Sequence, residues 1–144
     1  MDNEQSVVRQ KITQLYRDYE SRNLPNVLNG LPEDFCFEWA SDPRTARYSG
    51  ICHGKAELLA QLNDIGANFQ FNAYRAVNIL VDGDRAAAQL ELDLTSELTG
   101  RRFSVKLAHF WSFKAGVPTH LVEYQDTALI ASESGARSSA HRTA

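Results

Sequence analysis

Side chains that can transfer protons lie within a largely apolar stretch, LAHFWSFKAGVPTHLVEYQD, residues 107–126. Those that lie among its aromatic residues and raise the question of an acid–base site are His109, Glu123 and Asp126. If the stretch forms a hairpin that turns at Gly116, His109 lies opposite Glu123. Opposed residues in an antiparallel pair have Cβ atoms about 5 Å apart, so an imidazole and a carboxylate there can form a hydrogen bond. A shift of the register by one residue would move Glu123 to the other face of the sheet.

An imidazole–carboxylate pair is suited to proton transfer, because imidazole titrates near neutral pH and the carboxylate selects one of its tautomers. We therefore predict that His109 acts as a general acid or base and that Glu123 orients it. The alternative is structural, since such a pair also satisfies two buried polar groups in a core without any chemistry. Asp126 lies on the opposite face from Glu123, at the end of the strand, which predicts a capping or turn role.

Aromatic residues at alternating positions predict an apolar wall beside this pair. They share one face of a strand over residues 35–39 and one face of a strand over residues 102–113, so they could hold a flat apolar molecule. A tyrosine on the first helix and a histidine ahead of the third helix are further candidates, although packing and loop roles are the simpler alternatives for them. The candidate substrate-binding residues are Tyr16, Phe37, Trp39, His53, Trp111 and Phe113.

The apolar spacing predicts helices in the first half of the chain and strands in the second, the order typical of an α+β fold. A strongly curved antiparallel sheet wrapped over the helices would leave a central pocket. Gly66 is expected to end the third helix, residues 41–54 to form a loop, and Asp82-Gly83-Asp84 to form a hairpin turn. The predicted helices cover residues 8–19, 24–30 and 55–65, and the predicted strands cover residues 35–39, 69–81, 85–95, 102–113 and 119–128.

Length and composition fit one domain over residues 1–130, followed by a tail over residues 131–144 that lacks large apolar residues and is expected to be disordered. The net charge of −3 gives no reason to expect nucleic acid or an anionic membrane as a partner. The N-terminus lacks the pattern of a signal peptide and no apolar run could span a bilayer, so we expect a cytoplasmic protein. Cys36 and Cys52 are then expected to be reduced thiols, and no metal site is expected.

The chain resembles the SnoaL-like proteins of the nuclear transport factor 2-like superfamily over about residues 5–130. The resemblance implies a cone-shaped, curved antiparallel sheet wrapped around N-terminal helices, a deep central pocket, and a homodimer packed through the outer face of the sheet. The motifs that carry it are Leu15-Tyr16, Gly50 and Gly54 in YSGICHGKAELL, Asp82-Gly83-Asp84, Thr99-Gly100, His109–Phe113 with Gly116, and Glu123-Tyr124-Gln125-Asp126.

Two activities of this superfamily lack their residues here. Where a ketosteroid isomerase has its basic aspartate, this sequence has Trp39, and where it has its protonated aspartate, this sequence has His109. Limonene epoxide hydrolases use an Asp-Arg-Asp arrangement, of which Glu123 matches one aspartate while Leu90 and Leu92 fall at or near the other two positions. Neither activity is expected, but both comparisons place His109 and Glu123 on the pocket wall.

We predict a protein that binds a small hydrophobic molecule in an aromatic-lined pocket. The His109–Glu123 pair favours isomerase, cyclase or hydratase chemistry without a cofactor, the type of reaction that the resemblance to SnoaL-like polyketide cyclases implies. The missing isomerase and hydrolase residues favour the alternative, a non-catalytic ligand-binding protein or a dimeric accessory protein.

Overall fold

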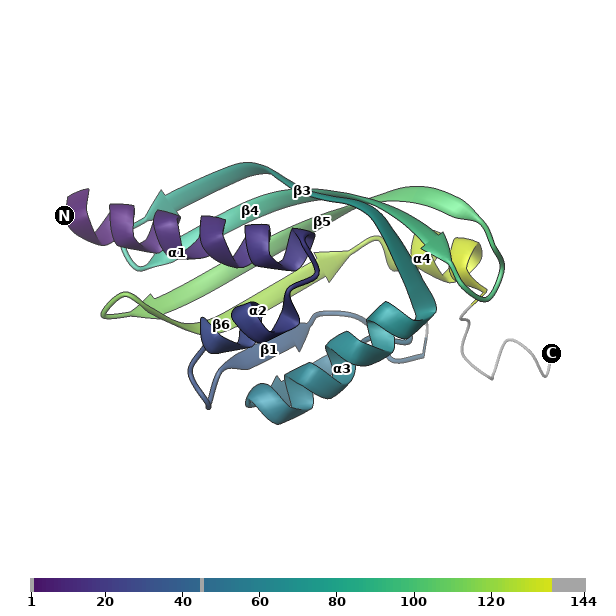
Figure 1. The fold of residues 1–144 in the computed structure, drawn as a ribbon, viewed down its shortest axis with the longest axis horizontal. Helices are drawn as coiled ribbons and strands as arrows, with labels where there is room; N and C mark the ends of the chain where they lie inside the picture. Colours follow the sequence, from purple (N-terminus) through teal and green to yellow (C-terminus); the bar gives the residue numbers. More distant parts are fainter. Residues whose placement is uncertain (1, 45, 136–144) are drawn as a thin grey trace.

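A computed structural model describes residues 2–44 and 46–135 of the chain. The three N-terminal helices lie along one side of a long, curved sheet, and the last helix lies near one end of it (Figure 1). No helix in the described residues is long and apolar enough to cross a membrane. The elements, in chain order, are α1 (Asp2–Glu20), α2 (Leu24–Asn29), β1 (Cys36–Trp39), β2 (Gly50–His53), α3 (Lys55–Asn68), β3 (Phe69–Asp82), β4 (Arg85–Ser96), β5 (Arg102–Lys114), β6 (Val117–Gln125) and α4 (Thr127–Ser134).

The sheet has the strand order β2-β1-β6-β5-β4-β3. Strands β3 to β6 form the antiparallel meander that the sequence predicts, and the turn at Asp82-Gly83-Asp84 joins β3 to β4. Gly83 has a φ of 60° there, a left-handed conformation that glycine adopts without steric cost. The pairing of β1 with β6 is parallel, so the sheet is mixed although most of its pairs are antiparallel.

The hairpin of β5 and β6 has the register that the sequence predicts for His109 and Glu123. His109 pairs with Glu123, as predicted. Nearer the turn, an irregularity in the ladder makes Phe113 pair with Pro118 rather than with Thr119. The irregularity lies between the turn and the His109–Glu123 pair and shifts the register by one residue, so that His109 pairs with Glu123 rather than with Val122.

Two local predictions were wrong. The stretch 41–54, expected to be a loop, contains strand β2, which pairs with β1 at the edge of the sheet. Its four residues are too few to show an alternating pattern, and tertiary pairing decides their conformation. Gly66 does not end α3, which continues to Asn68 before Phe69 becomes extended.

The final described helix, α4, was also not expected. Asp126 caps it by accepting a hydrogen bond from the backbone N–H of Leu129 at 3.1 Å, which confirms the capping role. Residues 131–134, assigned from the sequence to a disordered tail, form the end of this helix, and residues 136–144 lie outside the described residues. Ser96 Oγ donates to the Ser134 carbonyl at 3.0 Å, which fastens the helix to the sheet.

The core lies between the helices and the concave face of the sheet. On β4, Leu90, Leu92 and Leu94 are buried, while the alternate residues face outward, as predicted. Outward-facing Glu91 and Asp93 form ion pairs with arginines on neighbouring strands. The period of two along β4 therefore separates an apolar concave face from a polar convex face.

Replacing Leu90 with alanine should lower the free energy of unfolding by about 2–5 kcal/mol, because the side chain is fully buried and its loss leaves a cavity. Leu80→Ala is the matched control, since Leu80 is 69% exposed and should change stability by less than about 0.5 kcal/mol. Urea unfolding of both variants measures the difference. Equal effects would contradict the assignment of the concave face as the core.

Candidate functional site

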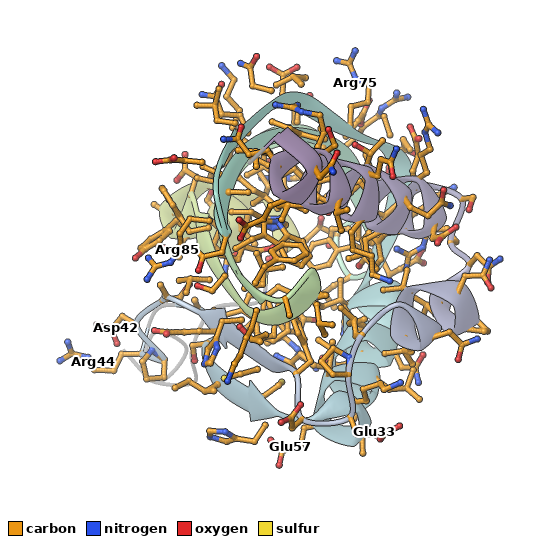
Figure 2. All side chains as sticks on the ribbon, turned by 90° about the vertical axis from the view of Figure 1, so that its left-hand side faces the viewer. Glu33, Asp42, Arg44, Glu57, Arg75 and Arg85 are labelled. Atoms are coloured by element: carbon orange, nitrogen blue, oxygen red, sulfur yellow. The ribbon has the colours of Figure 1, made fainter. Side chains whose placement is uncertain are left out.

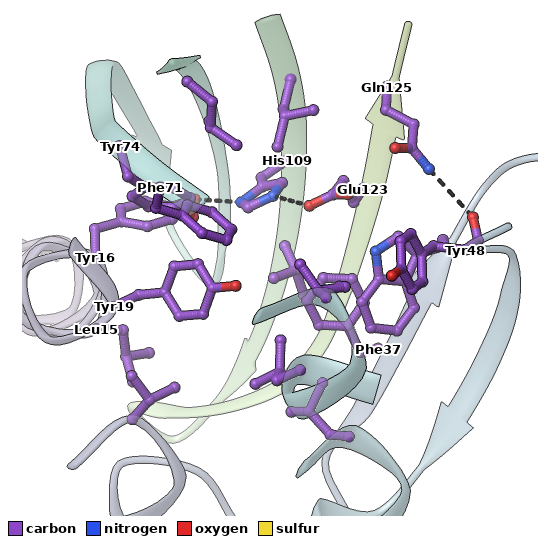
Figure 3. A pocket seen from close by; sticks show the side chains of 18 of the residues that line it. Leu15, Tyr16, Tyr19, Phe37, Tyr48, Phe71, Tyr74, His109, Glu123 and Gln125 are labelled. Carbon is purple, nitrogen blue, oxygen red and sulfur yellow. Dashed lines mark hydrogen bonds and ion pairs between the residues drawn. The ribbon is translucent and has the colours of Figure 1, made fainter. Parts of the chain in front are cut away.

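A cavity of about 120 Å³ lies between the concave face of the sheet and the helices. In an end-on view the sheet curls around the inward-pointing side chains, while the labelled charged residues lie at the periphery (Figure 2). The cavity wall is mainly aliphatic and aromatic, and His109 and Glu123 contribute polar groups to it. The predicted aromatic-lined pocket is therefore present, with both proposed acid–base residues on its wall (Figure 3).

His109 and Glu123 are in direct contact. Nε2 of His109 lies 2.8 Å from Oε1 of Glu123, and the two residues are only 3% and 9% exposed. Adjacent positions on β5 and β6 bring them together, since the β-hairpin register makes the two residues opposite partners. A carboxylate in such an apolar setting requires a hydrogen-bonding partner, which the imidazole supplies.

The second ring nitrogen of His109 is hydrogen-bonded to a residue of the first helix. Nδ1 of His109 lies 2.7 Å from Oη of Tyr16, and Nε1 of Trp111 donates to the same hydroxyl at 2.8 Å. These contacts form a four-residue hydrogen-bond chain, Trp111–Tyr16–His109–Glu123, which joins α1 to β5 and β6. Helical spacing places Tyr16 on the buried face of α1, together with Ile12.

Donors and acceptors along this chain determine where its hydrogens lie. Burial raises the pKa of Tyr16, the hydrogen bond from Trp111 offsets part of that rise, and the charge of Glu123 adds to it, so the hydroxyl stays protonated. Indole can only donate, so the hydroxyl hydrogen of Tyr16 is left to donate to Nδ1 of His109. With Nδ1 as the acceptor, Nε2 of the imidazole carries a hydrogen and donates it to the carboxylate of Glu123.

These hydrogen bonds leave the carboxylate of Glu123, rather than the imidazole of His109, able to bind a ligand. Both ring nitrogens of His109 are already hydrogen-bonded inside the protein. Glu123 uses Oε1 for its contact with His109, and its Oε2 has no hydrogen-bond partner among residues 2–44 and 46–135. Glu123 therefore lines the cavity with one carboxylate oxygen that is not hydrogen-bonded within these residues, whereas both nitrogens of the imidazole are occupied.

The predicted substrate-binding residues divide into two groups. Phe37, Trp39, Trp111 and Tyr16 line the cavity, and the rings of Phe37 and Trp39 are stacked with centroids 3.9 Å apart. The other two do not line it. Phe113 is buried against Trp111, and His53 is exposed on the edge strand β2.

Several polar lining residues were not singled out from the sequence. Tyr19 lies three residues after Tyr16 on α1, a spacing that could have identified it as a second tyrosine on the same helix face. Tyr74 follows an irregularity in the pairing of β3, where strand alternation no longer predicts direction. Gln125 donates to the carbonyl of Tyr48, in the loop before β2, at 3.2 Å, a contact that depends on tertiary structure alone.

Residues 12–121 match the family model of the SnoaL-like domain, and the chain belongs to this family. The part of the chain that the structure describes contains no cluster of three His, Cys, Asp or Glu residues that could hold a metal ion.

Solved structures share the fold at low sequence identity. A protein of unknown function from Burkholderia pseudomallei, described as NTF2-like, is 21% identical with a TM-score of 0.82, covering 90% of this chain and 98% of that one. A candidate isomerase from Rhodopseudomonas palustris is 21% identical with a TM-score of 0.73, covering 90% and 97%. TerC, co-crystallised with polyporic acid, is 17% identical with a TM-score of 0.77, covering 90% and 99%. No curated protein matches by sequence.

Tyr16→Phe should lower the free energy of unfolding by about 2–4 kcal/mol. The substitution leaves Trp111 Nε1 and His109 Nδ1 buried without their shared partner, and each unsatisfied group costs about 1–3 kcal/mol. Tyr124→Phe, at a half-exposed position, should stay within about 0.5 kcal/mol of wild type. Chemical denaturation of both variants measures the effect. A neutral Tyr16→Phe would contradict the four-residue chain.

Stability should also fall at alkaline pH. Burial raises the pKa of four hydroxyls, with that of Tyr48 reaching about 12: Tyr16, Tyr19, Tyr48 and Tyr74. In the unfolded chain tyrosine titrates near about 10. Because the folded state binds these protons more tightly, the hydroxyls contribute their full stabilisation below about pH 10, and that contribution is lost as the pH rises through about 12. Unfolding free energies across this range test the decline, which Tyr48→Phe should make shallower.

Proposed function

We propose that the protein binds a small, flat, hydrophobic molecule in the cavity and moves a proton on it without a metal or an organic cofactor. One observation carries the proposal: a buried hydrogen-bond chain ends in the carboxylate of a cavity-lining residue, and one oxygen of that carboxylate has no hydrogen-bond partner among the described residues. A carboxylate removed from bulk water is a stronger base toward a bound ligand, because no hydration shell competes for it.

In this proposal Glu123 is the catalytic acid–base group and His109 is a positioning residue. The sequence alone favoured the opposite assignment, with His109 as the acid or base. The two hydrogen bonds of the imidazole support the reversal, since they leave neither ring nitrogen for a ligand. Tyr16 fixes the tautomer of His109, so its contribution to the reaction is indirect.

The reaction class that fits is proton abstraction next to a carbonyl group. The C–H bond breaks, its proton moves to Oε2 of Glu123, and the electron pair moves onto the carbonyl oxygen as an enolate. Return of the proton to a different carbon gives an isomerase. Attack of the enolate carbon on a second carbonyl of the same molecule, with the proton passed to the new alkoxide, gives a cyclase. General acid–base help of this kind contributes about 10²–10⁴ in rate.

Fold relatives support this class without defining the substrate. Among them are a candidate isomerase and TerC, whose structure includes polyporic acid, so the same architecture accommodates small organic molecules elsewhere. The apolar wall here suits a ligand of similar general character.

A second function, ligand binding without chemistry, is favoured by the completeness of the hydrogen bonds around His109. A satisfied pair stabilises the buried carboxylate whether or not any substrate reacts. The cavity volume of about 120 Å³ is close to that of an engineered 150 Å³ apolar cavity that binds benzene, so passive binding of a single-ring compound also fits.

We further propose a homodimer formed through the convex face of the sheet. Phe110 and Tyr124 are about half exposed there, at 52% and 50%, and form an edge-to-face pair with centroids 5.8 Å apart. Exposed aromatic residues on an otherwise polar sheet face are enriched at protein interfaces.

Turnover by Glu123→Gln distinguishes the two functions. The ligand is first captured from cell extract and identified by native mass spectrometry, and its conversion is then followed with purified variants. Glu123→Gln should lower kcat by about 10²–10⁴, because the amide cannot accept the proton. His109→Gln should give a smaller loss, since the carboxylate remains but loses its orienting partner.

Glu91→Gln is the matched control, because Glu91 lies on the convex face in an exposed ion pair and should leave kcat unchanged. If Glu123→Gln converts the captured ligand as fast as wild type, the carboxylate is not the base. If no variant, including wild type, converts it, ligand binding without chemistry is the function.

A further inference from the structure

Tyr74 lines the cavity from the sheet side. It pairs with Leu92 on β4, whose side chain is buried in the concave face, and directly paired residues of two strands share a face. The ring of Tyr74 lies beside those of Tyr16 and Tyr19 on α1, with centroids 6.2 Å and 4.8 Å away (Figure 3). With only 7% of its surface exposed, Tyr74 is held between the sheet and α1.

The tyrosines that line the cavity are Tyr16, Tyr19, Tyr48 and Tyr74. They differ in what their hydroxyl groups contact. Tyr16 belongs to the four-residue hydrogen-bond chain, and Tyr48 accepts a hydrogen bond from Asn68 at 3.3 Å. Burial raises the pKa of Tyr19, and the guanidinium of Arg22 beside it offsets part of that rise. Tyr74, in contrast, has no hydrogen-bond partner among residues 2–44 and 46–135.

The hydroxyl of Tyr74 is nevertheless not sealed off. Among the described residues, the one buried side-chain polar atom that lacks both a partner and accessible surface is Nη1 of Arg22. The unpartnered hydroxyl of Tyr74 therefore keeps accessible surface, and the cavity that this residue lines is the space it faces. A buried hydroxyl without a hydrogen bond is costly, so a ligand that supplies an acceptor here gains affinity.

The surroundings of this hydroxyl define the acceptor. Burial raises the pKa of Tyr74 well above its ordinary value, and two neighbouring tyrosines and Glu123 add to the rise, so the hydroxyl stays protonated and donates. No lysine or arginine is among the described residues that line the cavity. An anionic ligand would therefore meet the charge of Glu123 in an apolar setting without a compensating cation. A neutral oxygen is the acceptor that fits.

We propose that the hydroxyl of Tyr74 donates a hydrogen bond to a carbonyl oxygen of the ligand, so that the ligand is a neutral aromatic ketone. The apolar wall holds the aromatic ring, and the Tyr74 hydroxyl determines where the carbonyl group lies relative to Glu123. This inference rests on the proposed function for its choice of cavity and of a carbonyl compound. Binding itself requires no chemistry.

Two probes of the same shape test the proposal. Acetophenone and α-methylstyrene differ in one group, since a carbonyl oxygen in the first is a methylene group in the second. Each is titrated into the full chain and followed by NMR. Tyr74→Phe should weaken the binding of acetophenone about 3–10-fold, the contribution of one hydrogen bond, and should leave the binding of α-methylstyrene unchanged.

Two controls separate a lost hydrogen bond from a damaged fold. Tyr124→Phe, which removes a hydroxyl from a half-exposed position, should bind both probes as wild type does. Tyr74→Phe should keep the urea midpoint of wild type, because the hydroxyl that it removes has no partner in the protein. The proposal is overturned if wild type does not bind acetophenone, if Tyr74→Phe binds it equally well, or if Tyr74→Phe weakens both probes alike.

The carbonyl group of the bound probe provides a second readout. The stretching band of ¹³C-labelled acetophenone should lie at lower frequency in wild type than in Tyr74→Phe, because a hydrogen bond weakens the C=O bond. Identical bands in the two proteins would show that the hydroxyl does not contact the carbonyl oxygen, and would overturn the proposal. The ligand captured from cell extract should itself carry a carbonyl group, and one without it would have the same consequence.

The outcome is separable from that of the proposed function. Glu123→Gln should lower turnover of the captured ligand but keep the difference between the two probes, since Tyr74 is unchanged. If acetophenone binds through Tyr74 while Glu123→Gln converts the captured ligand at the wild-type rate, the acid–base proposal fails and the carbonyl site stands. The opposite pair of results removes the carbonyl site alone.

Discussion

The cost of burying a carboxylate governs this structure. Glu123 is 9% exposed and lies on the wall of an apolar cavity, where an unpartnered charge would be strongly destabilising. The imidazole of His109 supplies the hydrogen bond that this carboxylate needs, and its second nitrogen, also buried, then needs a hydrogen bond as well. Tyr16 supplies it and in turn takes the indole N–H of Trp111. Satisfying one carboxylate thus fixes the mutual position of α1, β5 and β6.

This dependence couples fold and site. The hydroxyl of Tyr16 reaches His109 only if α1 packs against the concave face with Val8 and Ile12 buried beneath it. His109 reaches Glu123 only in the observed register of the hairpin. A loosened helix or a slipped strand would therefore leave polar groups unsatisfied as well as apolar groups exposed. The four-residue hydrogen-bond chain thus increases the free-energy difference between the native packing and incorrect packings, a role that buried polar networks serve in other proteins.

Much of this could be predicted from the sequence, because local patterns carry it. The meander follows from alternation and turn residues. The pairing of His109 with Glu123 agrees with a count back from Gly116, although the turn itself pairs Lys114 with Val117 and an irregularity at Ser112 and Phe113 restores the predicted register. The parallel partnership of β1 with β6 could not be predicted, since a four-residue strand carries no information about its neighbour. The roles of His109 and Glu123 also depended on a distant residue, Tyr16, whose contact with Nδ1 exists only after folding.

The place of β6 within the sheet has one more consequence. Because β6 runs between β1 and β5, the backbone of Glu123 is tied on both sides, and its carbonyl also accepts a hydrogen bond from Ala40 at 3.0 Å. The carboxylate of Glu123 is thus carried by a backbone that is hydrogen-bonded on both sides. Part of the surrounding apolar wall, by contrast, comes from α2, α3 and the start of β3, which take no part in the hydrogen-bond chain around Glu123. Substitutions in that part of the wall therefore reshape the cavity while the position of the carboxylate stays the same.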